Sequence, residues 1–203
     1  IKSMFAARSM TEGNPSKRLM EFAVPMLIGN VAQQLYNTAD SVIVGHYVGD
    51  NALAAVGSAS PILNLLLALF VGIATGAGIV VSQSFGAKDR ERLTTAVGTC
   101  LSLSLIASIV IMIIGPIITR PMLELLGTPE SIIGWCTSYL KIYFYGILGF
   151  FMYNMLSGVL RGMGDSLSAL VYLLIAAALN VILDLVFVAK FGMGVAGVAL
   201  ATI

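Results

Sequence analysis

The sequence predicts an all-α protein, a polytopic bundle of transmembrane helices, and three observations support this prediction. Of its 203 residues, 58% are hydrophobic and only 10% are charged, whereas a water-soluble domain usually has about 25% charged residues. The mean hydropathy is +0.96. The apolar residues also fall into runs of the length that a helix needs to cross a bilayer, about 20 residues. The net charge of +1 offers no basic surface for nucleic acid.

These runs predict a polar arm, five complete spans and part of a sixth. The arm, residues 1–18, shows no apolar core or cleavage site of a secretory signal. We expect Gly115-Pro116 to close the third span. A chain end inside hydrocarbon would leave helix carbonyls without partners, so we expect the natural protein to continue beyond Ile203. The expected spans cover residues 19–46, 53–85, 94–118, 131–158, 167–190 and 194–203.

The basic residues predict the orientation of the chain in the plasma (inner) membrane. Most of them lie in segments that would share one face of the bilayer, while Arg120 and Lys190 lie on the other. Cytoplasmic loops carry the excess of Lys and Arg, so the N-terminus is expected in the cytoplasm. The residues on the predicted cytoplasmic side are Arg8, Lys17, Arg18, Lys88, Arg90, Arg92 and Arg161.

Lys141 stands inside the fourth span among four aromatic residues. An aromatic belt at the outer interface is the favoured interpretation, because such rings and a snorkelling lysine are typical of that depth. An intramembrane cation is the alternative. The belt would consist of Trp135, Tyr139, Tyr143 and Tyr145.

Two acidic residues, Asp40 and Asp184, lie inside predicted spans at a similar depth. A charged side chain at the centre of a membrane helix costs at least about 2.5–3.5 kcal/mol, and such residues usually face a cavity or a partner. Asp40 belongs to a stripe at helical spacing, and Asn180 precedes Asp184 by one turn. The stripe in the first span reads Asn30, Gln33, Asn37, Asp40 and Val44.

Two inward carboxylates with amide neighbours predict a site for H⁺ or Na⁺. A carboxylate in a low-dielectric cavity can exchange a proton near neutral pH, and carboxylate, amide and hydroxyl oxygens also suit a hard cation. The alternative is that both acids only join packed helices by hydrogen bonds. That arrangement is common for Asn or Gln but unusual for two carboxylates.

Other features point to structural roles or exclude catalysis. Pro25 should kink the first span, either as a static bend or as a hinge. His46 is interpreted as an interface residue, and Cys100 and Cys136 as buried thiols without metal-ligand spacing. Gly72, Gly76 and Gly78 would let helices pack closely. Walker, HExxH and GxSxG motifs are absent from the sequence, so no enzyme activity is expected.

Four stretches of the chain resemble the multidrug and toxic compound extrusion (MATE) transporters. They follow one another over nearly the whole chain after Met10, and together they are specific. The resemblance implies twelve helices in two six-helix lobes related by a pseudo-two-fold axis, of which this chain would be the first lobe, cut in its sixth helix. The stretches are FAVPMLIGNVAQQLYNTADSVIVGHYVGDNALAAVG, SQSFGAKDRERL, VLRGMGDS and LNVILDLVFVAKFGMGVAGVALAT.

The resemblance also implies an activity and a set of site residues. Family members are antiporters, coupled to H⁺ or Na⁺, that export amphipathic and often cationic organic compounds by alternating access between their lobes. The implied partners are drug-like molecules, the bilayer and a C-terminal six-helix lobe, without a further cofactor. By motif, the cation site would be Asp40, Asn180, Asp184 and Thr202, and the substrate cavity would include Gln34, Tyr36, Asn37 and Asn154.

Two other functions remain as alternatives. A lipid-linked oligosaccharide flippase of the same superfamily would need a large cationic cavity for a pyrophosphate, and this chain has few intramembrane Lys or Arg. A membrane enzyme would need a reactive cluster at an interface, which the sequence does not show. A non-transporting membrane subunit is the remaining hypothesis.

Overall fold

The computed structural model describes residues 14–203, which form helices joined by short turns, with no strand in that range. The predicted all-α membrane fold is confirmed. Residues 1–13 of the predicted arm, with Arg8, lie outside the described residues. The elements are α1 (Pro15–Tyr47), α2 (Asp50–Gly86), α3 (Arg90–Leu125), α4 (Glu130–Gly162), α5 (Ser166–Asp184), the π-helix η1 (Leu185–Lys190) and α6 (Gly194–Thr202).

Side-chain caps fix where three of the helices begin. The Asn14 side chain accepts a hydrogen bond from the Ser16 backbone N–H at 3.1 Å, and Pro15 takes the first helical position. Helix α1 therefore includes residues 15–18, which the sequence had placed in the arm. Asp89 and Asp165 cap α3 and α5 in the same way, each at 2.9 Å.

Helix α3 does not end at Gly115-Pro116, as the sequence had suggested, but continues through Pro116 and Pro121 to Leu125. Proline is tolerated within membrane helices because neighbouring helices and polar side chains compensate for the missing hydrogen bond. Gly115 has a packing role instead, since a Cβ there would lie 2.3 Å from Cδ1 of Phe144 on α4.

Four segments are long and apolar enough to cross a membrane: α2, α3, α4 and the continuous stretch Ser166–Lys190. Helix α1 is just as long at 33 residues, but its polar stripe lowers its hydropathy below theirs. Helix α6 has nine residues. The chain is therefore a multi-pass membrane protein.

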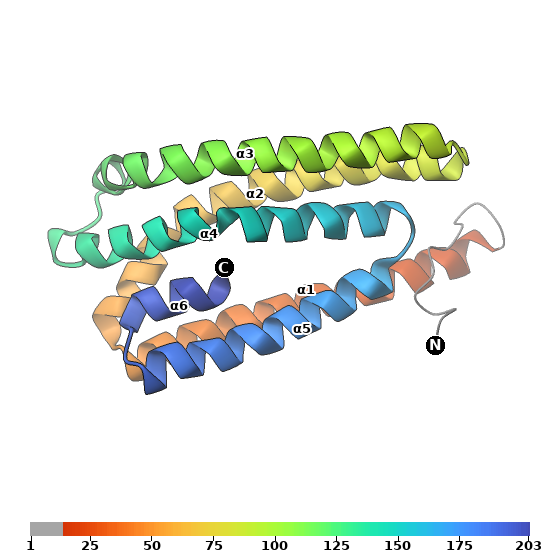
Figure 1. Ribbon diagram of the computed structural model, residues 1–203. Helices are drawn as coiled ribbons and strands as arrows, with labels where there is room; N and C mark the ends of the chain where they lie inside the picture. The colour runs from red at the N-terminus through yellow and green to blue at the C-terminus, as the bar shows by residue number, and fades with distance from the viewer. Residues whose placement is uncertain (1–13) are drawn as a thin grey trace.

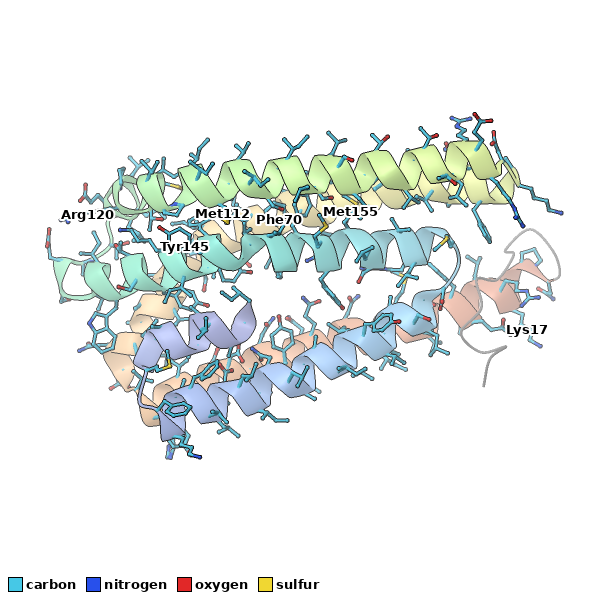
Figure 2. All side chains as sticks on the ribbon, in the orientation of Figure 1. Lys17, Phe70, Met112, Arg120, Tyr145 and Met155 are labelled. Carbon is cyan, nitrogen blue, oxygen red and sulfur yellow. The ribbon has the colours of Figure 1, made fainter. Side chains whose placement is uncertain are left out.

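The helices form two groups (Figure 1). In the first group, α4 packs along both α2 and α3. In the second group, α1 packs along α5, and α6 lies between the groups near one end of the bundle. Lys17 and Arg120 mark opposite ends of the molecule, while Phe70 lies within the first group (Figure 2), where its ring stacks on Phe151 at 4.3 Å.

Glycines bring α2 and α4 into backbone contact. A Cβ at Gly158 would lie 2.6 Å from the Ala74 carbonyl oxygen, and one at Gly162 would lie 2.6 Å from that of Gly78. Of the three glycines predicted to allow close packing, only Gly78 does so. A Cβ at Gly72 or at Gly76 would meet nothing within 4 Å, so these two leave space on the surface of α2 instead.

Candidate functional site

The structure brings Asp40 and Asp184 together. Asp40 lies half-buried on α1, and Asp184 is the last residue of α5, with no exposed surface. Because α1 runs along α5 and also contacts η1, the two carboxyls are near enough for their charges to interact directly. Neither carboxyl points away from the bundle into lipid.

One carboxyl oxygen of Asp40 and both of Asp184 are buried without hydrogen-bond partners among the described residues. Asn180, one turn before Asp184 on α5, shares this property. Buried polar atoms are nearly always hydrogen-bonded, and each one left unsatisfied costs about 1–3 kcal/mol. The atoms are Oδ1 of Asp40, Oδ1 and Nδ2 of Asn180, and both carboxyl oxygens of Asp184.

A π-helix begins directly after Asp184. The turns of η1, Leu185–Lys190, are wider than α-helical turns. Such segments are rare, and they occur frequently at functional sites. Here the change of helix type places the buried carboxyl at the junction of two helical geometries.

Two tyrosines that the sequence had assigned to an outer aromatic belt are instead part of the core. Tyr139 and Tyr143 are each 5% exposed, whereas Trp135 is 43% and Tyr145 is 61% exposed. Only the latter two fit a belt. They are exposed because α4 turns its other side toward α2, α3 and α6.

Tyr139 approaches the acids from α4. Its hydroxyl lies within electrostatic range of Asp40, Asp184 and Tyr36. Sequence reasoning missed this proximity, although the spacing of Tyr139 and Tyr143, one helical turn apart, was a usable signal for a shared face. The two rings lie 6.5 Å apart, centroid to centroid.

A cavity of about 250 Å³ lies beside the acid pair, between α1, α4, α5 and α6. Of the predicted site residues, Tyr36, Asn154, Asn180 and Thr202 line it, together with Pro25. Asp40 and Asp184 do not line it, although Tyr36 and Asn180 stand one helical turn from them. The Thr202 hydroxyl donates to the Val198 carbonyl at 2.9 Å, so its oxygen keeps lone pairs for a ligand.

Two predicted cavity residues lie elsewhere. Gln34 and Asn37 are exposed on another side of α1 and do not line this cavity. The Asn37 side-chain amide donates to Oε1 of Gln34 at 3.3 Å. Asn30 and Gln33, from the same polar stripe, do line the cavity.

Arg161 lines two cavities at once. The sequence had placed it in a loop between spans, but it lies in the last turn of α4, half-buried, and its Nε donates to the Ser157 carbonyl at 3.2 Å. Besides the 250 Å³ cavity it lines a second one of about 420 Å³, which Phe22 and Met26 bound on the α1 side. Arg161 is the only basic residue among the described lining of either cavity.

The remaining titratable residues do not gather into a metal centre within residues 14–203: no group of three His, Cys, Asp or Glu side chains occurs there. His46 is exposed at the end of α1, and its ring meets Tyr47 edge-on at 4.9 Å. Cys136 is buried and Cys100 is half-buried, both as free thiols.

The sequence matches a known family and several curated proteins. The MatE family model covers residues 25–186. The probable multidrug resistance proteins YoeA and YpnP of Bacillus subtilis (strain 168) are 36% and 35% identical over 90% and 97% of this chain. The chain spans only 40% and 44% of the lengths of these two relatives.

Solved structures agree with this match. A MOP superfamily transporter from Pyrococcus furiosus superposes with a TM-score of 0.88 at 31% identity, over 94% of this chain and 42% of its own. A MATE protein solved in a bent and in a straight conformation matches with a TM-score of 0.87 in both cases, at 31% identity and with the same coverage.

Proposed function

The chain belongs to the MatE family, and on that premise we propose that its six helices form one lobe of a cation-coupled antiporter that exports amphipathic organic compounds across the plasma membrane. The observation that carries this proposal is the pair Asp40 and Asp184, two neighbouring acids whose buried oxygens lack partners among the described residues. Intramembrane carboxylates of this kind mark ion and proton pathways.

We assign the cation site to Asp40, Asn180, Asp184 and Thr202. The two carboxylates repel each other in a medium of low dielectric unless a proton or a cation lies between them. A bound H⁺ or Na⁺ removes this repulsion. Asn180 and Thr202 line the neighbouring cavity and add the amide and hydroxyl oxygens that a hard cation prefers.

Ion loading is coupled to transport through α1. When the acids are neutralised, the hydration of the 250 Å³ cavity changes and α1 repacks near Pro25, which lines that cavity. We propose Pro25 as the hinge, since a proline removes one backbone hydrogen bond from the helix. Substrate then leaves outward and the ion leaves inward. The ion can drive this cycle only if its affinity differs between the two states.

The substrate surface is proposed to extend beyond this lobe. Tyr36 and Asn154 face the cavity within it, whereas Gln34 and Asn37 are exposed on α1. We propose that this exposed face of α1 lines a chamber between this lobe and a second, C-terminal lobe. The N-terminus is proposed to lie in the cytoplasm, following the positive charge of residues 88–92 and of Lys17 and Arg18.

The flippase alternative is not favoured. A pyrophosphate-linked sugar needs several cations in its cavity, and Arg161 alone supplies positive charge to the two cavities described above. An enzyme is not favoured either, since the family consists of transporters.

Ion-driven efflux of a fluorescent cationic dye from vesicles tests the proposal. Asp40→Asn should slow efflux by about 5- to 150-fold, the range of typical coupling free energies. Asp50→Asn is the matched control, because Asp50 is exposed at the start of α2 and outside the site. Collapsing the H⁺ and the Na⁺ gradient one at a time identifies the coupling ion. Undiminished efflux in Asp40→Asn would refute the assignment.

A further inference from the structure

Among the described residues, Arg161 is the one charged side chain that lines the 250 Å³ or the 420 Å³ cavity. The two cavities adjoin each other at this point, since Met26, Asn154 and Arg161 line both. The α4–α5 turn that follows Arg161 lies at the end of the bundle that Lys17 marks (Figures 1 and 2). A positive charge therefore stands in the shared wall of two otherwise uncharged cavities, at the end proposed to face the cytoplasm.

Most hydrogen-bond donors of Arg161 are not used within the described chain. Its Nε donates to the Ser157 carbonyl at 3.2 Å, which suits a basic residue at the negative end of a helix dipole. A guanidinium has five N–H groups, and the four on the terminal nitrogens make no hydrogen bond to a described residue. The position at the end of α4 thus explains one donor and leaves four for a ligand.

No carboxylate of the described residues balances this charge. Neither ion pair recorded among the described side chains involves Arg161. The nearest acid along the chain, Asp165, is 7% exposed, and both of its oxygens accept from Ser168: one from the backbone N–H at 2.9 Å and one from the hydroxyl at 2.6 Å. Asp165 is therefore engaged in starting α5, and an anion in the cavities would meet an uncompensated guanidinium.

The backbone that carries Arg161 is held firmly. Gly158 and Gly162 lie on either side of it in the chain, and both press against α2. A Cβ at either glycine would lie 2.6 Å from a carbonyl oxygen of that helix. Because α4 cannot shift along α2 at this contact, the guanidinium is positioned before a ligand arrives, and such preorganisation lowers the cost of binding.

The rest of the two cavities offers one further polar contact and an apolar surface. Asn154 lies two turns before Arg161, about 10 Å along α4 at 1.5 Å per residue. Its Nδ2 donates to the Phe150 carbonyl at 2.8 Å, so its side-chain oxygen is left to accept a hydrogen bond. A volume of 420 Å³ is within the usual range for a ligand site. The large apolar side chains of that cavity are Phe22, Met26, Val71 and Ile79.

We propose that these adjoining cavities bind amphipathic compounds that carry a carboxylate, which the Arg161 guanidinium holds through two parallel hydrogen bonds. The apolar body of the compound lies between α1 and α2, and an N–H or O–H group of it donates to Asn154. One guanidinium matches one carboxylate, whereas a compound without negative charge gains nothing from this contact. The inference rests on the proposed function and deepens it, because it names a substrate class that this lobe selects and makes Arg161 a specificity-determining residue.

Equilibrium binding of two dyes tests the proposal. A rhodamine with a free carboxylate and the methyl ester of the same dye share their rings and differ in one negative charge. Fluorescence anisotropy gives both affinities for the full-length protein in phosphatidylcholine nanodiscs without an ion gradient, with empty nanodiscs as background. The acid should bind about tenfold more tightly than the ester, the low end of the contribution of a hydrogen bond to a charged group. Equal affinities would overturn the proposal and leave the ion assignment, which efflux tests, untouched.

Variants of Arg161 test whether this residue makes the selection. Arg161→Gln should abolish the preference for the acid and leave the affinity for the ester, which a general loss of fold would not do. Arg161→Lys keeps the charge without the paired donors and should give an intermediate preference. Lys17→Gln is the control, because Lys17 is exposed at the same end and lines neither cavity. A preference equal to that of the parent protein in both Arg161 variants would overturn the assignment.

The place of the apolar body is tested on α2. Thr75 lines the 420 Å³ cavity, and its hydroxyl donates to the Val71 carbonyl at 2.7 Å. Thr75→Leu should weaken the binding of both dyes. Thr95→Leu is the matched control, since Thr95 makes the same kind of bond within α3 and lines neither cavity. Equal binding in these two variants would contradict the placement. If phosphatidylglycerol in the nanodiscs removes the acid preference, Arg161 holds a lipid phosphate instead and the proposal is wrong.

Discussion

At the level of single residues, one further group lies within electrostatic range of the acid pair, Tyr139. This side chain comes from α4, while Asp40 and Asp184 come from the other group of helices. Its hydroxyl lies within electrostatic range of both carboxyls. We interpret Tyr139 as a positioning residue that helps to hold the carboxyls in the geometry that an ion needs.

We predict that Tyr139→Phe weakens ion binding by about two- to tenfold, because one polar hydroxyl next to the acids contributes about 0.5–1.5 kcal/mol. The measurement is the ion concentration that gives half-maximal efflux. The maximal rate at saturating ion should change less, which separates a positioning role from general damage to the fold. Tyr145→Phe is the control, since Tyr145 is 61% exposed on the same helix. Equal half-maximal concentrations in both variants would contradict the prediction.

The sequence was sufficient to single out the two acids but not the tyrosine. A carboxylate inside an apolar run is informative on its own, because placing its charge inside the membrane costs free energy and such residues usually have a functional role. A tyrosine inside such a run has an ordinary explanation as an interface residue, and only burial in the folded bundle distinguishes Tyr139, at 5% exposed, from Tyr145, at 61%. Arg161 was placed in a loop for a different reason: composition does not locate a helix end to within a turn.

At the level of helices, glycine decides how closely α2 and α4 approach. The contact runs through Gly78, Gly158 and Gly162, each facing backbone on the other helix. Close backbone approach increases the van der Waals contact that drives association of helices in a membrane.

We predict that Gly158→Val separates α2 from α4 and destabilises the lobe by about 1–3 kcal/mol, the usual cost of overpacking. The added side chain begins 2.6 Å from the Ala74 carbonyl oxygen, and backbone cannot rotate away. Gly134→Val on the same helix should have little effect, because a Cβ at Gly134 meets nothing within 4 Å. Thermal unfolding of both variants in detergent measures the difference. A melting temperature for Gly158→Val equal to that of Gly134→Val would show that the contact is not tight.

Hydropathy predicted that these helices exist but not how they end or change type. Apolar runs define the buried length of a span, yet α3 extends seven residues past its predicted end at 118, to Leu125, because proline interrupts only one hydrogen bond. The π-helix after Asp184 leaves no trace in composition either, since LVFVAK would suit an α-helix equally well. The wider turn is visible only in the folded chain.

At the level of the whole molecule, the 420 Å³ cavity forms a wedge between the two groups of helices. Phe22 and Met26 bound it on α1, and Val71 and Ile79 bound it on α2. Helix α1 packs much less extensively against α2 than against α5. A change of angle between the groups would thus meet least resistance at this wedge, and Pro25 stands beside it in α1.

We predict that the coupling ion changes the separation of α1 and α2 at this wedge. Spin labels on Met20→Cys and Ser82→Cys, in a Cys100→Ala and Cys136→Ser background, report that distance by pulsed electron paramagnetic resonance in nanodiscs. The distance distribution should shift when the ion is added. A label pair within the first group, Ser82→Cys with Ile106→Cys on α3, should give the same distribution in both states.

The proline variants show whether α1 itself bends. Pro25→Ala restores the missing backbone hydrogen bond, so the ion should produce a smaller shift between the labels on α1 and α2. Pro61→Ala makes the same chemical change inside α2, away from the wedge, and should leave the full shift. If both variants respond like the parent protein, the movement is carried by rotation of α1 and α5 as one unit. If no label pair responds to the ion, the acids and the wedge are not coupled within this lobe.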